Sequence, residues 1–164
     1  MNLKWEVRPP ERRRAAIPEE AEERLVRMLS GKVKCGGAIP VIKKDHNPGH
    51  EKTPEAGEFR SDDCLWFFNS VPAFIAETGK WDFLKKVVPY GDEGEATVYG
   101  HLKQALLFNL ERMGADGLPC GLLADWNECI KHGYKGQSLF VAFQLRLGLT
   151  TYADISTKKK KKAE

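Results

Sequence analysis

The sequence predicts an all-α fold in which successive helices pack as antiparallel hairpins. Apolar residues recur at the three- and four-residue spacing of a helix face in several segments of the chain. No segment shows the strict alternation of apolar and polar residues that is typical of a half-buried strand. Segments rich in Gly and Pro separate the helical segments, and helices joined in this way commonly pack side by side in opposite directions.

The first helix is expected to begin at Pro18, after an irregular N-terminal arm formed by residues 1–17. Pro suits the first position of a helix, where no backbone N–H is needed, and the acidic residues that follow it complement the positive end of the helix dipole. Leu25 and Leu29 provide a short apolar stripe, and Gly31 is the expected end of the helix.

A long loop is expected at residues 32–59, with a short extended piece at residues 38–42. The second helix then begins with Ser61 as its N-cap, because a Ser hydroxyl can accept a hydrogen bond from a free backbone N–H of the first turn. It ends at Gly79, since glycine readily adopts the left-handed conformation that closes many helices.

Three further helices complete the predicted fold. A short helix is expected at residues 81–87, followed by a turn at residues 89–95. The clearest helix spans residues 97–113, where apolar side chains fall on one face, and it ends before Gly114. The last helix is expected at residues 138–151.

Two predicted loops, residues 32–59 and 115–136, are much longer than the ~2–8 residues that usually connect helices in a helical domain. The second loop carries apolar side chains next to carboxylates, which indicates an ordered functional loop rather than a spacer. The C-terminal residues 156–164 contain a run of lysines and are expected to form a disordered, solvated tail.

The composition excludes several classes of protein. The chain has a net charge of +3, and most of this excess lies in the C-terminal lysines, so the body has no basic face for nucleic acid. No segment approaches the ~20 apolar residues of a membrane-spanning helix, and the N-terminus does not resemble a signal peptide. We therefore expect a cytoplasmic protein that binds neither nucleic acid nor membranes.

No metal site is expected. The cysteines form no C-x-x-C pair, which is the usual spacing of zinc ligands. His46 and His50 are four residues apart, but the intervening Asn-Pro-Gly segment prevents them from sharing one helix face.

The segment Ala124-Asp125-Trp126-Asn127-Glu128 is the first candidate for chemistry. Burial beside a tryptophan disfavours the charged form of a carboxylate and raises its pKa, which keeps a carboxylic acid protonated for general acid catalysis near neutral pH. The alternative, which the local chemistry alone favours, is a structural role in which Asp125 caps a short turn, Trp126 packs and Asn127 bonds to the backbone.

The segment from Arg60 to Trp66 is the second candidate, because it combines a guanidinium group, the carboxylates of Asp62 and Asp63, and an aromatic ring. Guanidinium and carboxylate groups hydrogen-bond to sugar hydroxyls, and an aromatic face covers the C–H side of a sugar ring. The alternative is a plain helix start, where acidic residues are favoured by the helix dipole.

Four segments together carry a resemblance to a known family. In chain order they read RSDDCLW at residues 60–66, GEATVYGHLK at 94–103, GLPCGLLADWNEC at 117–129 and GQSLFVAFQL at 136–145. This order resembles the inverting phosphorylases of β-linked disaccharides, which include the cellobiose, chitobiose, laminaribiose and cellodextrin phosphorylases. The sequence departs from the family pattern at Cys35 and Glu128, where Asp is usual, and at Gln137, where Glu is usual.

The resemblance implies that residues 18–155 form part of an α/α toroid, the ring of helical hairpins that is the catalytic domain of this family. It also implies that Asp125 is the general acid. Side chains of the two candidate segments are then the expected substrate-binding residues: Arg60, Asp62, Asp63, Trp66, Trp126 and Asn127.

The function implied by the resemblance is the cleavage of a β-linked disaccharide or oligosaccharide by inorganic phosphate, with inversion, to give an α-sugar 1-phosphate. Phosphate is a co-substrate, and no cofactor is expected. Because the chain is shorter than a complete toroid, we expect a fragment of an enzyme that forms a homodimer. The alternative is a non-catalytic helical module that binds sugar weakly or binds a partner chain.

Overall fold

The computed structural model describes residues 18–39, 59–127, 129–130 and 133–161. The expected N-terminal arm, residues 1–17, lies outside the described residues, as does most of the first long loop. The described part is mostly helical, as predicted. It contains four α-helices and two short 3-10 helices: α1 (Pro18–Ser30), η2 (Asp63–Leu65), α2 (Phe67–Thr78), η3 (Trp81–Lys85), α3 (Val98–Leu110) and α4 (Leu139–Lys161).

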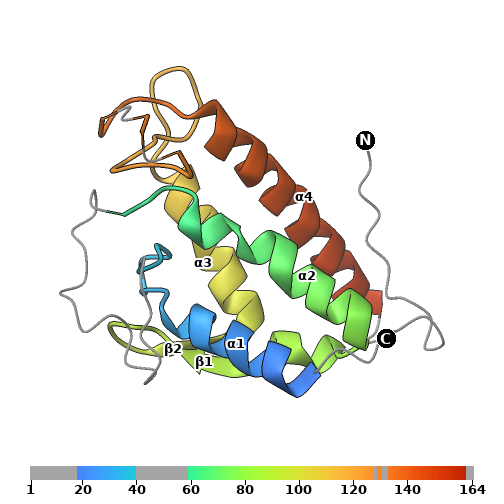
Figure 1. Ribbon diagram of the computed structural model, residues 1–164. Coiled ribbons are helices and arrows are strands. Elements are labelled where there is room, and N and C mark those ends of the chain that lie inside the picture. The colour runs from blue at the N-terminus through green and yellow to red at the C-terminus, as the bar shows by residue number, and fades with distance from the viewer. Residues whose placement is uncertain (1–17, 40–58, 128, 131–132, 162–164) are drawn as a thin grey trace.

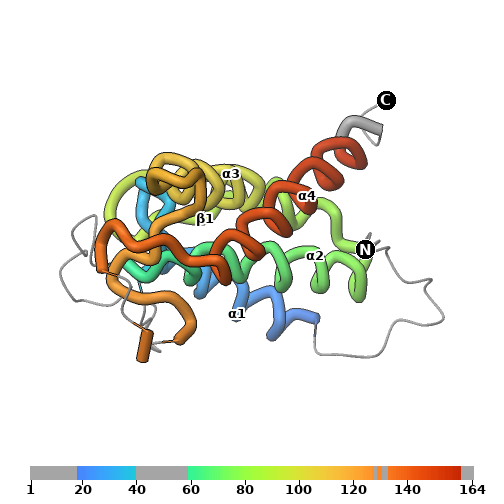
Figure 2. Tube along the Cα trace, turned by 90° about the horizontal axis from the view of Figure 1, so that it is seen from above, coloured from blue at the N-terminus to red at the C-terminus, as the bar shows by residue number. Residues whose placement is uncertain are grey.

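Successive long helices run in opposite directions. Figure 1 shows α2 and α4 side by side and running in the same direction. Helix α3, which lies between them in the sequence, runs in the opposite direction. The view from above agrees that α4 lies next to α2, with α1 on the other side of α2 (Figure 2). Helix α4 packs against both α2 and α3, so the last connection brings the C-terminal part of the chain back onto the earlier helices.

A small sheet corrects the prediction that the chain has no strands. Strands β1 (Val87–Pro89) and β2 (Glu95–Thr97) form an antiparallel pair with Val88 opposite Ala96. Gly94 has a φ of 76° and its carbonyl accepts a hydrogen bond from the Tyr90 N–H at 2.9 Å, which closes the turn. The helix expected at residues 81–87 therefore ends at Lys85. Strands of three residues are too short for an alternating pattern to be recognised in the sequence.

The ends of two helices follow local rules. Gly79 adopts a φ of 72° and donates its N–H to the Ile75 carbonyl at 2.8 Å, so the predicted end of α2 is confirmed. The side chain of Thr97 accepts a hydrogen bond from the Gly100 N–H at 3.0 Å and caps α3. The predicted cap at Ser61 is wrong, because α2 begins only at Phe67 and Ser61 bonds to another segment described below.

Helix α4 is longer than predicted and includes most of the segment expected to be a disordered tail. Its C-terminal part packs on the first turn of α3: Tyr152 stacks on Tyr99 with ring centroids 4.7 Å apart, and the hydroxyls of Tyr99 and Ser156 lie 2.7 Å apart. Ile155 is fully buried. Lysine is a good helix former, so the lysine run does not end the helix once these contacts hold it. Residues 162–164 lie outside the described residues.

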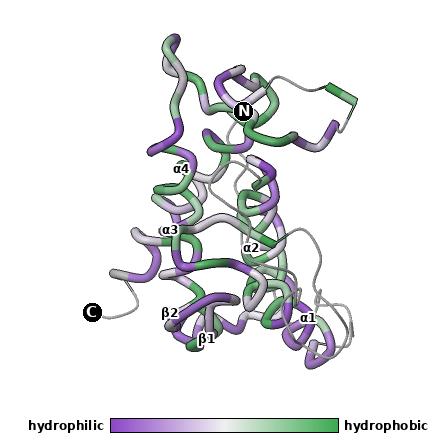
Figure 3. The backbone as a smooth tube through the Cα atoms, turned by 90° about the vertical axis from the view of Figure 1, so that its left-hand side faces the viewer, coloured by the Kyte–Doolittle hydropathy of each residue, from purple (hydrophilic) through white to green (hydrophobic). Residues whose placement is uncertain are grey.

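The core forms where α2, α3 and α4 meet the segment after α1. Helix α2 is more hydrophobic than α1 along its length (Figure 3), and six of its side chains are buried, whereas α1 buries two. The loop after α1 packs against α3 at Gly36, where a Cβ atom would lie 2.1 Å from the Gln104 carbonyl oxygen, so no other residue fits there.

A lysine is buried in this core. Lys32 has no exposed surface, and its Nζ donates a hydrogen bond to the backbone carbonyl of His101 and lies 5.9 Å from the centre of the Phe67 ring. Burial lowers the pKa of Lys32 to about 8. His101 is itself buried, and its Nε2 hydrogen-bonds to the Val88 carbonyl at 2.9 Å, which ties α3 to the first strand. Burial lowers the pKa of His101 to about 4, so the ring is neutral at pH 7.

Candidate functional site

The two candidate segments of the sequence meet at the end of the molecule where α2 begins (Figure 1). The Ser61 N–H donates to the Ala124 carbonyl at 3.1 Å, and the Leu123 N–H donates to the Phe59 carbonyl at 3.2 Å. Leu122 is held there with a φ of 56°, a left-handed conformation that is unusual for a leucine. We call this region, formed by residues 59–66, 122–127 and 138–140, the loop end.

Asp125 is only 4% exposed and anchors its loop. Its Oδ1 accepts a hydrogen bond from the Asn127 N–H at 2.9 Å, and its Oδ2 accepts one from the Ser138 hydroxyl at 2.6 Å. The Ser138 oxygen in turn accepts the Val141 N–H at 3.2 Å, so Ser138 caps α4. These contacts are those of the turn-forming role that the sequence left open for Asp125.

Asp62 is 2% exposed and is bonded differently. Its Oδ2 accepts a hydrogen bond from the Trp66 indole N–H at 2.9 Å, while its buried Oδ1 has no hydrogen-bond donor among the described residues. Burial raises the pKa of Asp62, the Trp66 N–H opposes this shift, and the nearby charge of Asp125 adds to it. Asp62 therefore has one buried carboxylate oxygen for which no donor occurs among the described residues.

Three aromatic rings lie at the loop end together with these carboxylates. Trp66 is 42% exposed and Trp126 is 67% exposed. Phe140, in the first turn of α4, lies between them, with its ring centroid 6.5 Å from that of Trp66 and 6.2 Å from that of Trp126. Sequence reasoning missed Phe140, because helical periodicity accounts for an apolar residue there without reference to the tryptophans. Phe140 lies two residues after Ser138, and this spacing indicates a link to the site only once it is known that α4 packs on the loop that carries Asp125.

The other predicted binding residues are less clearly arranged for a ligand. The Asn127 side-chain oxygen accepts the Cys129 N–H at 3.1 Å, so that side chain supports the turn. Arg60 pairs through its backbone with Leu122 and Ala124. Asp63 is half-buried and begins η2. All three thus lie at the loop end, but their described contacts are mainly with the chain itself.

No group of three potential metal ligands occurs among residues 18–39, 59–127, 129–130 and 133–161. His46 and His50 lie outside these ranges. Within the same ranges, no helix is both long and apolar enough to cross a membrane.

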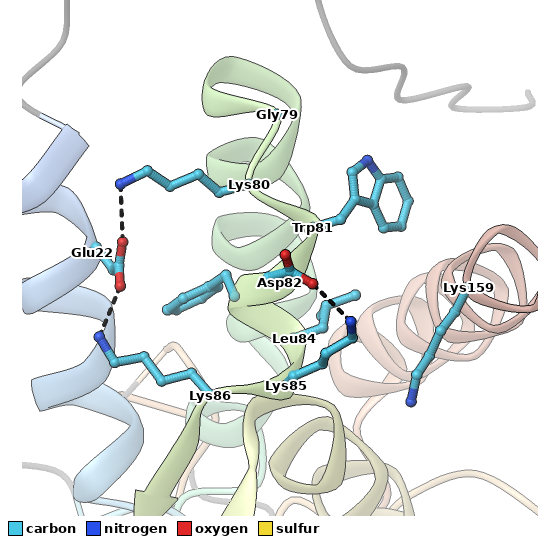
Figure 4. A pocket seen from close by; sticks show the side chains of 10 residues that line it. Glu22, Gly79, Lys80, Trp81, Asp82, Leu84, Lys85, Lys86 and Lys159 are labelled. Carbon is cyan, nitrogen blue, oxygen red and sulfur yellow. Dashed lines mark hydrogen bonds and ion pairs between the residues drawn. The ribbon is translucent and has the colours of Figure 1, made fainter. Parts of the chain in front are cut away.

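A pocket of about 640 Å³ lies elsewhere, at the end of the molecule where α2 finishes (Figure 4). Four lysines line it together with Glu22 and Asp82, and we therefore call this region the lysine end. The four lysines are Lys80, Lys85, Lys86 and Lys159. Figure 4 shows Lys80 and Lys86 reaching the Glu22 carboxylate from two sides, at 3.2 and 2.7 Å. None of the predicted site residues lines this pocket, so this pocket and the candidate chemistry are separate.

Comparison of the sequence with known proteins identifies its family. Residues 14–164 match the catalytic domain of the glycosyl hydrolase 94 superfamily. The N,N'-diacetylchitobiose phosphorylase of Vibrio proteolyticus is 33% identical over 160 residues, which cover 86% of this chain and 20% of that protein. The enzyme of the same name from Vibrio furnissii is 35% identical over 145 residues, covering 77% of this chain and 18% of that protein.

A third relative, the solabiose phosphorylase of Paenibacillus borealis, is 32% identical over 99 residues, covering 58% of this chain and 13% of that protein. The chain spans about a fifth of the length of the two Vibrio relatives. Since the family match covers nearly the whole sequence and includes both segments that meet at the loop end, this chain belongs to the catalytic-domain family of the glycosyl hydrolase 94 superfamily.

Proposed function

We propose that this chain forms part of the active site of a phosphorylase that cleaves a β-linked disaccharide or oligosaccharide with inorganic phosphate. Phosphate is the co-substrate and attacks the anomeric carbon, the bond from that carbon to the leaving oxygen breaks, and a general acid transfers its proton to the leaving oxygen. Attack from the opposite face inverts the anomeric centre and gives an α-sugar 1-phosphate. No cofactor takes part in this chemistry.

The single observation that carries the proposal is the pairing of residues 59–61 with residues 122–124. This pairing brings the buried carboxylates of Asp62 and Asp125 to one end of the molecule, beside exposed aromatic rings. Carboxylates that bond to hydroxyls and rings that cover C–H faces are the groups that bind sugars. The names of the Vibrio relatives point to N,N'-diacetylchitobiose as the first substrate to test.

We further propose that the helices are part of an α/α toroid, because successive long helices run antiparallel and the relatives are about five times longer than this chain. Other parts of such a protein then supply the phosphate-binding groups. The expectation that the enzyme is a homodimer stays a prediction, which the mass of the assembly in solution would test.

The identity of the general acid has two candidates. Asp125 is the one implied by the family resemblance. However, one of its oxygens accepts a hydrogen bond from its own loop and the other accepts one from Ser138, directly before α4, which favours an anchoring role. This observation adds Glu128, the other carboxylate of the Ala124 to Glu128 segment, as a second candidate for the proton donor. Glu128 lies outside the described residues.

The proposed function is tested by incubating N,N'-diacetylchitobiose and phosphate with this chain, and with this chain joined to the remaining segments of the Vibrio proteolyticus relative. We expect the joined protein to release an α-sugar 1-phosphate, detected by ³¹P NMR, only when phosphate is present. Sucrose, which is not a β-linked glucoside, is the control substrate. Sugar binding without any phosphorolysis by the joined protein would instead support the non-catalytic alternative.

The acid is assigned with Asp125→Asn and Glu128→Gln in the same joined protein. Removing a general acid lowers the rate on the disaccharide by roughly 10²–10⁴-fold. A dinitrophenyl β-glycoside needs no proton on its leaving group, so loss of the true acid should spare it. A variant that loses activity equally on both substrates has lost the geometry of the site, and near-normal cleavage of the disaccharide excludes its residue as the acid.

A further inference from the structure

The pocket at the lysine end has no part in the proposed reaction. It lies where α2 finishes, whereas Asp62 and Asp125 belong to the loop end, where α2 begins (Figure 1, Figure 4). Helix α2 has 12 residues, which corresponds to a length of roughly 18 Å. The volume of the pocket, about 640 Å³, is within the range of roughly 300–1,000 Å³ that is usual for small-molecule sites. A ligand of this pocket would therefore bind separately from a sugar at the loop end.

The side of the pocket that faces α1 is neutralised by ion pairs. Glu22 lies between Lys80 and Lys86, with distances of 3.2 and 2.7 Å to the two ammonium groups. Lys80 also approaches Glu19, which does not line the pocket, at 4.0 Å. The ammonium groups on this side are thus already paired with carboxylates.

The side of the pocket away from Glu22 keeps an excess of positive charge. Figure 4 shows Trp81, Lys85 and Lys159 on this side. Lys85 pairs with Asp82 at 2.8 Å, but the Asp82 side chain is 88% exposed, so water weakens this pair. The described contact of Lys159 is with a ring rather than a carboxylate, since its Nζ lies 4.1 Å from the centre of the Tyr99 ring. Two ammonium groups therefore share one exposed carboxylate.

Helix ends explain only part of this charge. Lys80 follows the C-terminus of α2, and Lys159 lies in the last turn of α4, where the helix dipole favours cations. Lys85 and Lys86 stand at the end of η3, whose five residues give at most a small dipole. The helix dipoles thus account for two of the four lysines, and the other two need another explanation.

The lining of the pocket suits a phosphomonoester. Such a group carries a charge of about −1.5 to −2 at pH 7 and has acceptor oxygens that several ammonium groups can share, whereas a carboxylate carries a single charge. The ammonium group of lysine is a mobile point charge with rotatable donors, which binds phosphate well. Trp81, Phe83 and Leu84 add an apolar surface that the organic part of an ester can cover.

We propose that the lysine end binds a small phosphomonoester, whose phosphate is held by Lys85 and Lys159 and whose organic part lies on Trp81. Glu22 keeps the other two lysines of the pocket occupied and thereby limits the affinity of the site. This inference goes beyond the proposed function and does not depend on it. A sugar 1-phosphate, the class of product in that function, belongs to the ligand class of this second site.

The test titrates the full ¹⁵N-labelled chain with α-glucose 1-phosphate, inorganic phosphate and glucose. Trp81→Phe assigns the indole N–H resonance of Trp81, which should shift and saturate with α-glucose 1-phosphate. Inorganic phosphate should bind more weakly, because it has no organic part to cover Trp81, and glucose should leave this resonance unchanged. The indoles of Trp66 and Trp126 report on the loop end in the same spectra, so binding there is measured as a separate saturation curve.

Loss of the two unshielded charges should weaken the site. Lys85→Gln combined with Lys159→Gln should lower the affinity for α-glucose 1-phosphate by roughly tenfold, the effect of losing two partly exposed charge contacts. Lys34→Gln is the matched control, because Lys34 pairs with Glu93 at 2.8 Å and does not line the pocket. This control variant should bind as the wild type does.

Glu22→Gln should change the affinity in the opposite direction. It removes the carboxylate that Lys80 and Lys86 share, so both ammonium groups become available to the ligand. We expect the affinity for α-glucose 1-phosphate to rise by roughly threefold, the effect of releasing partly exposed charges. A gain in affinity cannot result from a loss of folding, so this variant complements the lysine substitutions.

Several outcomes would overturn the proposal. Equal losses for Lys34→Gln and for the variant that lacks Lys85 and Lys159 would mean that the overall charge of the chain attracts the phosphate. A shift confined to the indoles of the loop end, or an unchanged affinity in Glu22→Gln, would also contradict it. Equal affinities for inorganic phosphate and α-glucose 1-phosphate would overturn the assignment of an ester. None of these measurements follows phosphorolysis, so the proposed function stands or fails separately.

Discussion

The loop end and the lysine end of the molecule differ in how far their charged side chains are buried and in which groups bond to them. At the loop end, Asp62 and Asp125 are buried, and their described hydrogen bonds come from the Trp66 indole, the Asn127 backbone and the Ser138 hydroxyl, which are neutral groups. At the lysine end, Glu22 meets Lys80 and Lys86 in ion pairs whose lysine side chains are almost half exposed. The pocket of about 640 Å³ is at the lysine end, but the buried carboxylate oxygen of Asp62 that has no described donor is at the loop end.

This difference shows that the presence of a pocket alone is a poor guide to the site in this chain. Exposed ion pairs form at little cost and contribute little to stability, so they need no functional explanation. Buried carboxylates are costly unless they are fully bonded. Both oxygens of Asp125 accept hydrogen bonds, which the anchoring of a loop explains, whereas one buried oxygen of Asp62 has no donor among the described residues. The comparison therefore predicts distinct responses to mutation and pH.

The largest effect on stability is expected from Asp125→Ala. The change removes the acceptor for the Asn127 N–H and for the buried Ser138 hydroxyl, so it should lower the free energy of unfolding by about 2–4 kcal/mol. Asp125→Asn keeps one carbonyl acceptor and should cost less. Urea unfolding followed by circular dichroism measures both, and a loss below ~0.5 kcal/mol for Asp125→Ala, the range of neutral surface changes, would contradict the anchoring role.

Ser138→Ala should have the next largest effect, about 1–2 kcal/mol, because it removes the N-cap of α4 and one donor to Asp125. Ser138→Thr keeps the hydroxyl and is the control. Since both residues belong to one network, the loss in the Asp125→Ala, Ser138→Ala double variant should be smaller than the sum of the single losses. Strict additivity would show that Ser138 acts only on α4.

Asp62→Asn should change stability in the opposite direction, raising the free energy of unfolding by up to about 1 kcal/mol at pH 7, because it removes a buried charge with an unsatisfied oxygen. The pKa of Asp62 is raised in the folded protein, so the wild type bears this penalty fully above the folded pKa and loses it as the pH falls towards the ordinary value. The difference between variant and wild type should therefore disappear in acid. Destabilisation at pH 7 would mean that Asp62 is a structural residue.

Glu22→Gln, at the lysine end, should have the smallest effect, a loss below ~1 kcal/mol that added salt reduces further. The hydrogen bond from Lys86 lowers the pKa of Glu22, so its contribution is present above the ordinary value of 4.5 and is lost as the pH falls through the lowered folded pKa. The stability differences for Asp62→Asn and Glu22→Gln thus both disappear in acid, although at pH 7 the first variant is more stable than the wild type and the second is less stable. If Glu22→Gln lowered the free energy of unfolding as much as Asp125→Ala does, this result would contradict the contrast between the two ends.

Local signals in the sequence predicted much of the fold. The first helix begins at Pro18 and ends before Gly31 as expected, and Gly79 closes α2, because these residues act through their own backbone preferences. Features that depend on distant contacts were not predictable. The strand pair depends on closure of the Gly94 turn, and the extension of α4 depends on the stacking of Tyr152 on Tyr99.

The site shows the same division. The sequence identified the segments that carry Asp62 and Asp125 as candidates, but their chemistry alone did not decide between binding and structural roles. That choice depends on which atoms meet: the Ser138 hydroxyl reaches Asp125 from thirteen residues away, and Phe140 comes to lie between two tryptophans only when α4 docks. The separate roles of the two carboxylates follow from these tertiary contacts.

The buried amine of Lys32 has a practical consequence for following this fold. Acylating reagents attack neutral, accessible amines, and a pKa of about 8 makes this amine intrinsically more reactive than an ordinary lysine once it is reached. In the folded chain it has no exposed surface, so the surface lysines should be modified first. The extent of acylation at this one position, read by mass spectrometry, would then report how often the segment after α1 opens.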